Sequence, residues 1–128
     1  MKLLLDTHAL LWWWTDDPQL SAPARAAIAD TANDVLVSAA SAWEIATKQR
    51  LGKLDGVPEA RARFIELLAA DGFALLPILV THALHAGAHA ADHRDPFDRM
   101  LAAQAALEEA TLVTRDPAFS LFDCKLLW

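Results

Sequence analysis

Cysteine, glycine and proline are scarce in this 128-residue chain, which contains one Cys, four Gly and six Pro. The lone Cys124 excludes an internal disulfide and a zinc module built on several cysteines. The few Gly and Pro residues follow no period, which excludes a fibrous repeat. No apolar run approaches the roughly 18 residues needed to cross a bilayer. The run at residues 3–5 ends at Asp6, too early for a signal peptide. We therefore expect a cytoplasmic protein with no membrane partner.

Positive charge is scarce as well, with 11 Lys and Arg against 17 Asp and Glu, for a net charge of −6. A protein that holds nucleic acid by charge alone is expected to be basic. An acidic chain with such a partner needs a local basic rim around an acidic centre. The hydrophobic fraction of 55% excludes a disordered chain and suffices for one core. We predict a single domain over residues 1–128.

Short apolar strands alternate with helices along the chain. Strands are predicted at residues 3–5, 35–37, 73–76, 111–113 and within 121–127, and helices at 9–14, 21–31, 39–51, 59–71, 81–91 and 95–109. Apolar strands without a polar face are typical of a parallel sheet covered by helices on both sides. The pattern predicts an α/β fold, namely a three-layer α/β/α, Rossmann-like domain with a mostly parallel sheet of four to five strands.

Four acids lie where such a sheet binds its ligands, outside the carboxyl ends of the strands. They are Asp6, Glu44, Asp98 and Asp116. Asp6 and Asp116 follow the first and fourth strands, and Glu44 lies about two turns into the helix that leaves the second. Asp98 joins them if the helix opened by Asp95 begins at that edge. Four ionised carboxylates repel one another, so the cluster indicates a bound cation. Oxygen ligands favour Mg²⁺ or Mn²⁺.

Each acid also has a structural interpretation. Asp6 fits the start of a turn, and Asp116 before Pro117 fits a helix N-cap. Asp95 before Pro96 is interpreted mainly as an N-cap, which puts Asp98 at a position where an acid suits the helix dipole. Glu44 completes a capping-box pattern, but its helix is predicted to begin near Ser38, which places Glu44 in the second turn.

Four segments together resemble the PIN-domain ribonucleases, in particular the VapC toxins of bacterial toxin–antitoxin pairs. The segments are Asp6–His8, Ser41–Ile45, His93–Ala105 and Leu112–Asp116, and they follow the family's order and spacing across essentially the whole chain. The resemblance implies a metal-dependent endoribonuclease that hydrolyses RNA phosphodiester bonds with Mg²⁺ or Mn²⁺. It implies catalytic and metal-binding roles for Asp6, Glu44, Asp98 and Asp116, and supporting roles for Thr7, Asp95 and Thr114.

The resemblance also implies partners: an RNA substrate, a cognate antitoxin protein that blocks the site, and a second copy of the chain in a homodimer. Arg99 and Arg115 flank the acids in sequence and are predicted to contact the substrate. Arg94 and the basic residues that follow Glu44 extend this rim, which reconciles the acidic chain with a polyanionic substrate.

Two other functions fit parts of the pattern. A Mg²⁺-dependent phosphatase would use Asp6 as its nucleophile, but that chemistry expects a second acid at position 8, where the chain has His8. A non-catalytic RNA- or protein-binding module would keep the acids for stability alone, which mutually repelling carboxylates serve poorly.

Aromatic and imidazole side chains outside the acidic set receive structural interpretations. Trp12–Trp14 are predicted to join the core or a protein interface rather than stack on bases, and at least one of the three is expected to point outward. His82, His85 and His89 share one helical face and are predicted to form a polar stripe rather than a zinc site.

Overall fold

The computed structural model describes all 128 residues and contains five strands, six α-helices and one 3-10 helix. The strands are β1 (Lys2–Leu5), β2 (Asp34–Ser38), β3 (Ala74–Leu76), β4 (Thr111–Val113) and β5 (Lys125–Leu127). The helices are α1 (Thr7–Trp14), α2 (Ala22–Ala29), α3 (Ala39–Arg50), α4 (Phe64–Ala70), α5 (Val80–Ala88), α6 (Pro96–Leu107) and the 3-10 helix η1 (Pro117–Leu121). None of the helices combines the length and apolar character needed to span a bilayer.

All five strands form one sheet in the order β3-β2-β1-β4-β5. Every neighbouring pair is parallel, which confirms the predicted parallel sheet. The central strand β1 is flanked by β2 on one side and β4 on the other, so the chain order reverses there. In open parallel sheets this reversal opens a crevice beyond the carboxyl ends of the strands. Asp6 directly follows β1 and therefore lies at that crevice.

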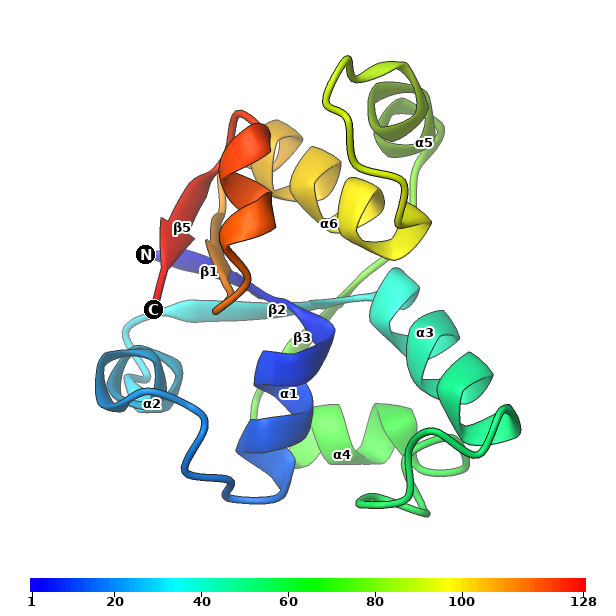
Figure 1. Cartoon of the computed structure of the whole chain (residues 1–128). Coiled ribbons are helices and arrows are strands. Elements are labelled where there is room, and N and C mark those ends of the chain that lie inside the picture. Colours follow the sequence, from blue (N-terminus) through cyan, green and yellow to red (C-terminus); the bar gives the residue numbers. More distant parts are fainter.

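Helices cover both faces of the sheet, as Figure 1 shows. Side chains of a strand alternate between the two faces. Leu3 and Leu5 accordingly pack in the larger core with α1, α2, α3 and α4. Leu4, between them, packs in the smaller core with α6 and the segment around η1. All three leucines are fully buried, and the predicted three-layer α/β/α architecture is confirmed.

One predicted helix is shorter than expected. The amphipathic pattern over residues 59–71 gives a helix only from Phe64, and residues 58–63 form turns. Val57 and Ala60 are buried in the core, and the Gln49 side-chain amide donates to the Val57 carbonyl oxygen at 2.9 Å. These contacts fix the chain in turns before the helix begins.

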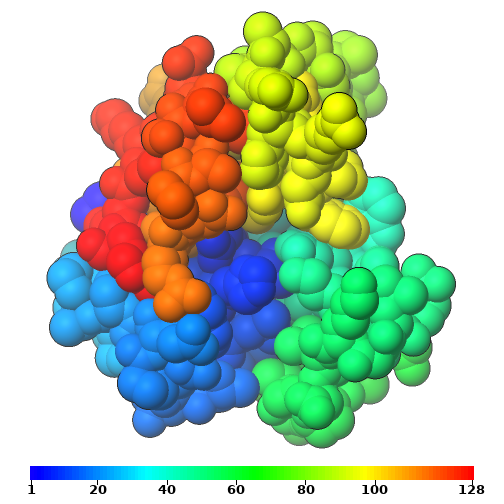
Figure 2. Space-filling view, in the orientation of Figure 1, coloured from blue at the N-terminus to red at the C-terminus, as the bar shows by residue number.

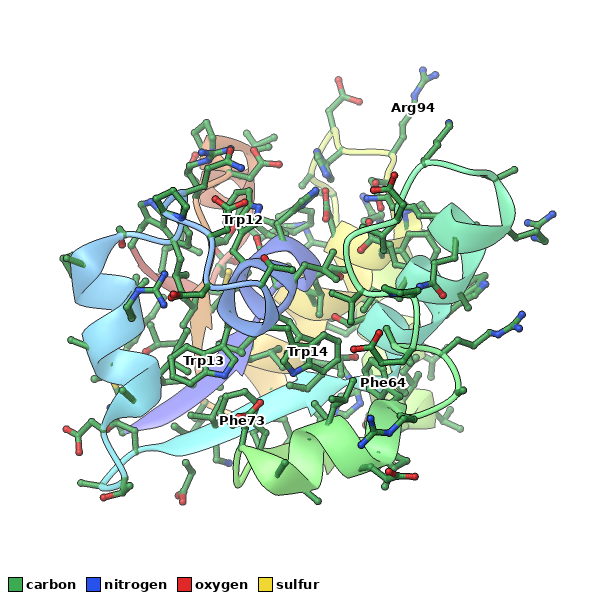
Figure 3. All side chains as sticks on the ribbon, turned by 90° about the horizontal axis from the view of Figure 1, so that it is seen from below. Trp12, Trp13, Trp14, Phe64, Phe73 and Arg94 are labelled. Carbon is green, nitrogen blue, oxygen red and sulfur yellow. The ribbon has the colours of Figure 1, made fainter.

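The expectation that one of Trp12–Trp14 points outward is wrong. All three are partly buried and pack against the larger core, because α1 is covered on three sides by segments distant in sequence. The pairs, drawn in part in Figure 3, are Trp12 with Trp128 (5.8 Å between ring centroids), Trp13 with Phe73 (5.9 Å) and Trp14 with Phe64 (5.6 Å). Trp43 is the exposed tryptophan, at 60%.

Candidate functional site

Asp6 is buried at the end of the central strand. Its carboxylate caps α1 by accepting a hydrogen bond from the Ala9 backbone N–H at 2.7 Å. Burial raises the pKa of Asp6, and the Thr114 hydroxyl and the Ala9 amide oppose that rise. No cationic side chain forms an ion pair with Asp6. Asp6 is thus a buried carboxyl group without an ion-pair partner, although the charge of His8 also opposes the rise of its pKa.

Glu44 lies in the second turn of α3. That helix begins directly after β2, where the Ser38 hydroxyl accepts from the Ala40 N–H, so Glu44 is not a capping-box residue. Its side chain is 7% exposed and forms an ion pair with Lys48, with Oε2 and Nζ 2.8 Å apart. The charge of Glu44 contributes to the raised pKa of Asp6 and of Asp98. Glu44 therefore lies within electrostatic range of both acids.

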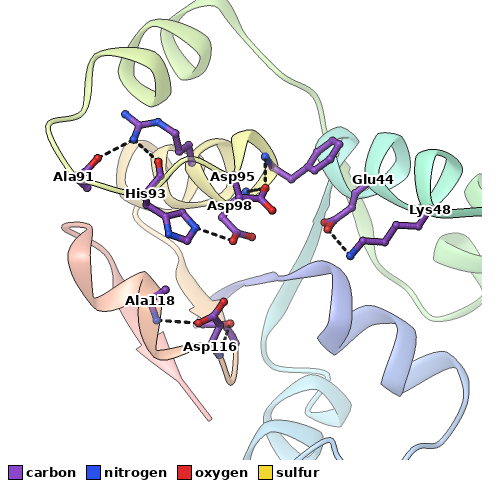
Figure 4. A network of polar contacts seen from close by, with 11 residues as sticks. Glu44, Lys48, Ala91, His93, Asp95, Asp98, Asp116 and Ala118 are labelled. Carbon is purple, nitrogen blue, oxygen red and sulfur yellow. Dashed lines mark hydrogen bonds and ion pairs between the residues drawn. The ribbon is translucent and has the colours of Figure 1, made fainter. Parts of the chain in front are cut away.

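Asp98 lies in the first turn of α6. Asp95 caps this helix by accepting from the Phe97 and Asp98 N–H groups at 2.9 and 3.2 Å, as its structural interpretation predicted. The Asp98 carboxylate oxygen Oδ2 is 2.9 Å from His93 Nε2. Burial, followed by the charges of Asp95 and Glu44, raises the pKa of Asp98 to about 6, against the opposing effect of His93. Figure 4 shows its carboxyl group turned toward the space between Glu44 and Asp116.

Asp116 lies at the rim of this region. It follows β4 and caps η1, where its carboxylate accepts from the Ala118 N–H at 2.9 Å. It lines an open hollow of about 550 Å³ together with Asp6 and Arg115. In Figure 2 the beginning of α1 forms the floor of a depression, bordered by the segment after β4, the start of α6 and the start of α3.

The four acids are gathered at one end of the sheet, but their side chains do not converge. No three His, Cys, Asp or Glu side chains lie close enough together to hold a metal ion. The reason is that three of the acids are turned toward other partners: Lys48 for Glu44, His93 for Asp98 and the Ala118 amide for Asp116. The donor set nevertheless fits a hard divalent cation, because it consists of carboxylate oxygens and includes Asp6, which has no ion-pair partner. Lys48 engages one oxygen of the Glu44 carboxylate, Oε2.

The hydroxyl of Thr7 is used between two helices. Thr7 Oγ1 donates to Ser41 Oγ at 3.0 Å, and both residues are buried. This bond joins the start of α1, beside Asp6, to the first turn of α3. Glu44 lies one turn further along the same helix. The resemblance implied a place for Thr7 beside the metal, and this place stays a prediction. Ser41 was missed as a site neighbour because its partner is 34 residues away in sequence.

The two arginines predicted to contact substrate differ in their surroundings. Arg99 donates four hydrogen bonds to backbone carbonyl oxygens, one in α5 and three in the segment between α5 and α6. Its contact with substrate stays a prediction. Arg115 is exposed and forms no ion pair. Its guanidinium lies 4.5 Å from the centre of the Trp12 ring and donates to Gln19 Oε1 at 3.3 Å. Arg115 thus offers a free positive charge beside Asp6 and Asp116.

His82 on α5 has a structural role. His82 is buried, accepts from the Leu79 N–H at Nδ1 and has Nε2 2.8 Å from Glu108, so it joins α5 to the end of α6. His93, by contrast, belongs to the site region; it opens one of the segments that carry the resemblance, but the sequence predicted no role for it at the site. The bond between His93 and Asp98 depends on how the segment before α6 folds.

The comparisons with known proteins agree with this architecture. The PIN domain family matches residues 3–123 of the chain. The chain is 50% identical over 52 residues to Ribonuclease VapC16 of Mycobacterium tuberculosis (strain ATCC 25618 / H37Rv), a stretch that covers 38% of this chain and 36% of that protein.

Solved structures with the same fold include two VapBC proteins. VapBC2 from Rickettsia felis, bound to a DNA fragment from its promoter, has a TM-score of 0.72 at 17% identity, over 100% of this chain and 99% of that one. VapBC-1 from nontypeable Haemophilus influenzae has a TM-score of 0.69 at 21% identity, over 99% and 97% of the two chains.

Proposed function

The chain belongs to the PIN domain family, and from that membership we propose that it is an endoribonuclease that depends on a divalent metal ion. One observation carries the proposal. Asp6, Glu44 and Asp98 come from three separate elements, and the charge of Glu44 acts on both of the others. Two carboxylates that each feel the charge of a third, one of the two buried without an ion-pair partner, are an environment that a divalent cation stabilises.

The proposed biological role is that of the toxin in a toxin–antitoxin pair. The relative that shares the 52-residue stretch is named a ribonuclease, and solved structures that share the fold include two VapBC pairs. These names support RNA as the substrate and a cognate antitoxin as the protein partner. A homodimer and a cytoplasmic location belong to the same proposal.

The residues that would hold the ion are Asp6, Glu44 and Asp98, with Asp116 at the rim. Mg²⁺ or Mn²⁺ suits these oxygen ligands. When bound, such an ion stabilises the charge that develops on a phosphoryl group and favours a nucleophilic water at neutral pH. Thr114 supports the Asp6 carboxyl group, Asp95 starts the helix that carries Asp98, and Thr7 braces α1 against α3 through Ser41.

Arg115 is the proposed contact for the RNA phosphate backbone. Stacking on Trp12 and the hydrogen bond to Gln19 hold its guanidinium in place, so less side-chain entropy is lost when a phosphate binds. A guanidinium binds phosphate oxygens through two parallel hydrogen bonds. One basic residue held at the rim of an acidic hollow supports binding of a polyanion by a chain of net charge −6.

The test is cleavage of a panel of cellular RNAs, with Mn²⁺ or with EDTA, by the parent and by the variants Asp6→Asn and Glu44→Gln. Asn still caps α1, so the first variant removes charge and keeps the fold. The matched control is Asp71→Asn, the same change at an exposed acid just before β3, at the opposite edge of the sheet.

We expect Mn²⁺-dependent cleavage by the parent and the control, and none above the EDTA background by the two site variants. Equal cleavage by all four proteins would overturn the proposed metal site. A phosphorylated Asp6 trapped with a phosphate ester would favour the phosphatase alternative instead.

A further inference from the structure

His93 lies in the segment between α5 and α6 and is assigned no role above. Its Nε2 is 2.9 Å from Asp98 Oδ2, and its imidazole is only 19% exposed. The ring packs edge-on against Phe122, with centroids 5.7 Å apart and planes at 85°, and lies 6.5 Å from Phe119. The imidazole therefore lies between the rings of Phe119 and Phe122 and the carboxylate of Asp98, a proposed metal ligand.

A single arginine holds the backbone that carries His93. The Arg99 side chain donates to four carbonyl oxygens: Ala86 and Ala91 at 2.9 and 3.0 Å, His93 at 2.8 Å, and His89. Residues 89–95 form neither helix nor strand, so their carbonyl groups need partners from elsewhere. Arg99 supplies several of these partners at once.

The contact of His93 with Asp98 and the contacts of Arg99 with the preceding segment are linked, because Arg99 directly follows Asp98 in α6. The helix that carries the carboxylate also carries the guanidinium that fixes the preceding segment. That segment brings the imidazole back onto the carboxylate. His93 Nε2 engages Oδ2, and no hydrogen bond reaches Oδ1. One oxygen of Asp98 is thus held, and the other is left for a cation.

We propose that His93 is a positioning residue of the metal site, which fixes the orientation of Asp98, and that Arg99 holds His93 in place. The inference rests on the proposed function, since it concerns the ion that Asp98 would hold. A carboxylate ligand that is oriented in advance loses less rotational freedom when it binds a cation. Partners of this kind, outside the ligand set, typically contribute 10–100-fold to metal affinity or activity.

The experiment measures Mn²⁺ affinity by isothermal titration calorimetry on the full chain, for the parent, His93→Leu and His93→Gln. Gln offers an amide N–H at nearly the position of the imidazole Nε2, whereas Leu fills the space without a donor. We expect His93→Leu to weaken Mn²⁺ binding about 10–100-fold, and His93→Gln to recover most of the loss. The matched control is His85→Leu, at an exposed histidine on α5, with unchanged affinity.

Cleavage assays supply a second readout. The positioning role predicts that His93→Leu needs more Mn²⁺ for half-maximal cleavage and regains nearly the parental rate at saturating Mn²⁺. Arg99→Lys keeps the positive charge but cannot bridge four carbonyl groups. It should likewise weaken Mn²⁺ binding.

The outcomes separate the two proposals. If the parent binds no Mn²⁺, the proposed metal site fails. If the parent binds Mn²⁺ and His93→Leu binds it equally well, with circular dichroism spectra that agree, the positioning role of His93 fails alone. Weaker RNA binding by Arg99→Lys with parental Mn²⁺ affinity would return Arg99 to the substrate-contact role predicted from sequence.

Discussion

The substitution Asp98→Asn is expected to make the metal-free protein more stable at neutral pH. Asp98 has a pKa of about 6 in the folded chain, above its ordinary 3.8, mainly because it is buried and next because like charges surround it. A raised folded pKa means that the folded state binds the proton more tightly than the unfolded state. The stability linked to this group is therefore full below pH 4 and is lost as the pH rises through about 6.

The magnitude follows from the size of that shift. A shift of about two pKa units corresponds to roughly 3 kcal/mol at most. The Asp98 side chain is 21% exposed, so solvent screening reduces this value, and the bond to His93 is weaker for a neutral amide. We expect Asp98→Asn to raise the free energy of unfolding at pH 7.5 by roughly 1–3 kcal/mol, or the Tm by about 4–10 °C for a chain of this size.

The assay is urea or thermal unfolding in EDTA at pH 4.5 and pH 7.5. The stabilisation should be largest at pH 7.5 and about a third of that at pH 4.5, where the carboxyl group is protonated in the folded state but still largely ionised in the unfolded state. The matched control is Asp116→Asn, an exposed cap whose loss of charge should change stability by no more than about 0.5 kcal/mol at either pH, because Asn caps equally well. A destabilised Asp98→Asn protein, or a gain independent of pH, would refute the electrostatic reasoning.

Two further predictions concern the substrate rim and the core. Arg115→Ala should weaken RNA binding and leave the Mn²⁺ affinity unchanged. It should also reduce the slope of log affinity for RNA against log salt concentration by about one phosphate contact. Fluorescence anisotropy at several salt concentrations measures this slope, and an unchanged slope would exclude a phosphate contact. Leu4→Ala removes a fully buried side chain of the central strand and should lower the free energy of unfolding by about 2–5 kcal/mol; a urea titration that gives less than 1 kcal/mol would mean that the smaller core repacks around the gap.

The antitoxin and homodimer interfaces proposed for this chain have exposed apolar surface to occupy. Val80 and Leu84, one helical turn apart on α5, are 75% and 68% exposed, and Trp43 on α3 is 60% exposed. Trp43 also lines a pocket of about 210 Å³ between α3, α5 and α6, whose lining is mostly apolar. Exposed apolar surface of this kind is typical of protein interfaces.

Local sequence determined the elements and the edge where the site lies. Apolar runs such as Leu3–Leu5 predict strands because a strand buried on both faces needs no polar side chain. Ser21 and Asp95 predict helix starts because a cap bonds to an amide only two or three residues away. The position of Asp6 and Asp116 after parallel strands follows from topology, because all carboxyl ends of such strands meet at one edge.

Tertiary structure decided which contacts several side chains in and around the site make. The strand order, with β1 in the centre, selects Asp6 as the acid at the crevice. The ion pair of Glu44 with Lys48 is local, because the two residues are four apart on α3. The partial burial of the three tryptophans of α1 against Trp128, Phe73 and Phe64, by contrast, depends on elements far apart in the sequence. The contacts of Arg99 and His93 depend on how the irregular segment before Asp98 folds back onto α6. A single sequence records only neighbours along the chain, whereas these contacts are set by which surfaces the folded chain brings together and by the hydrogen bonds that buried polar groups must find there.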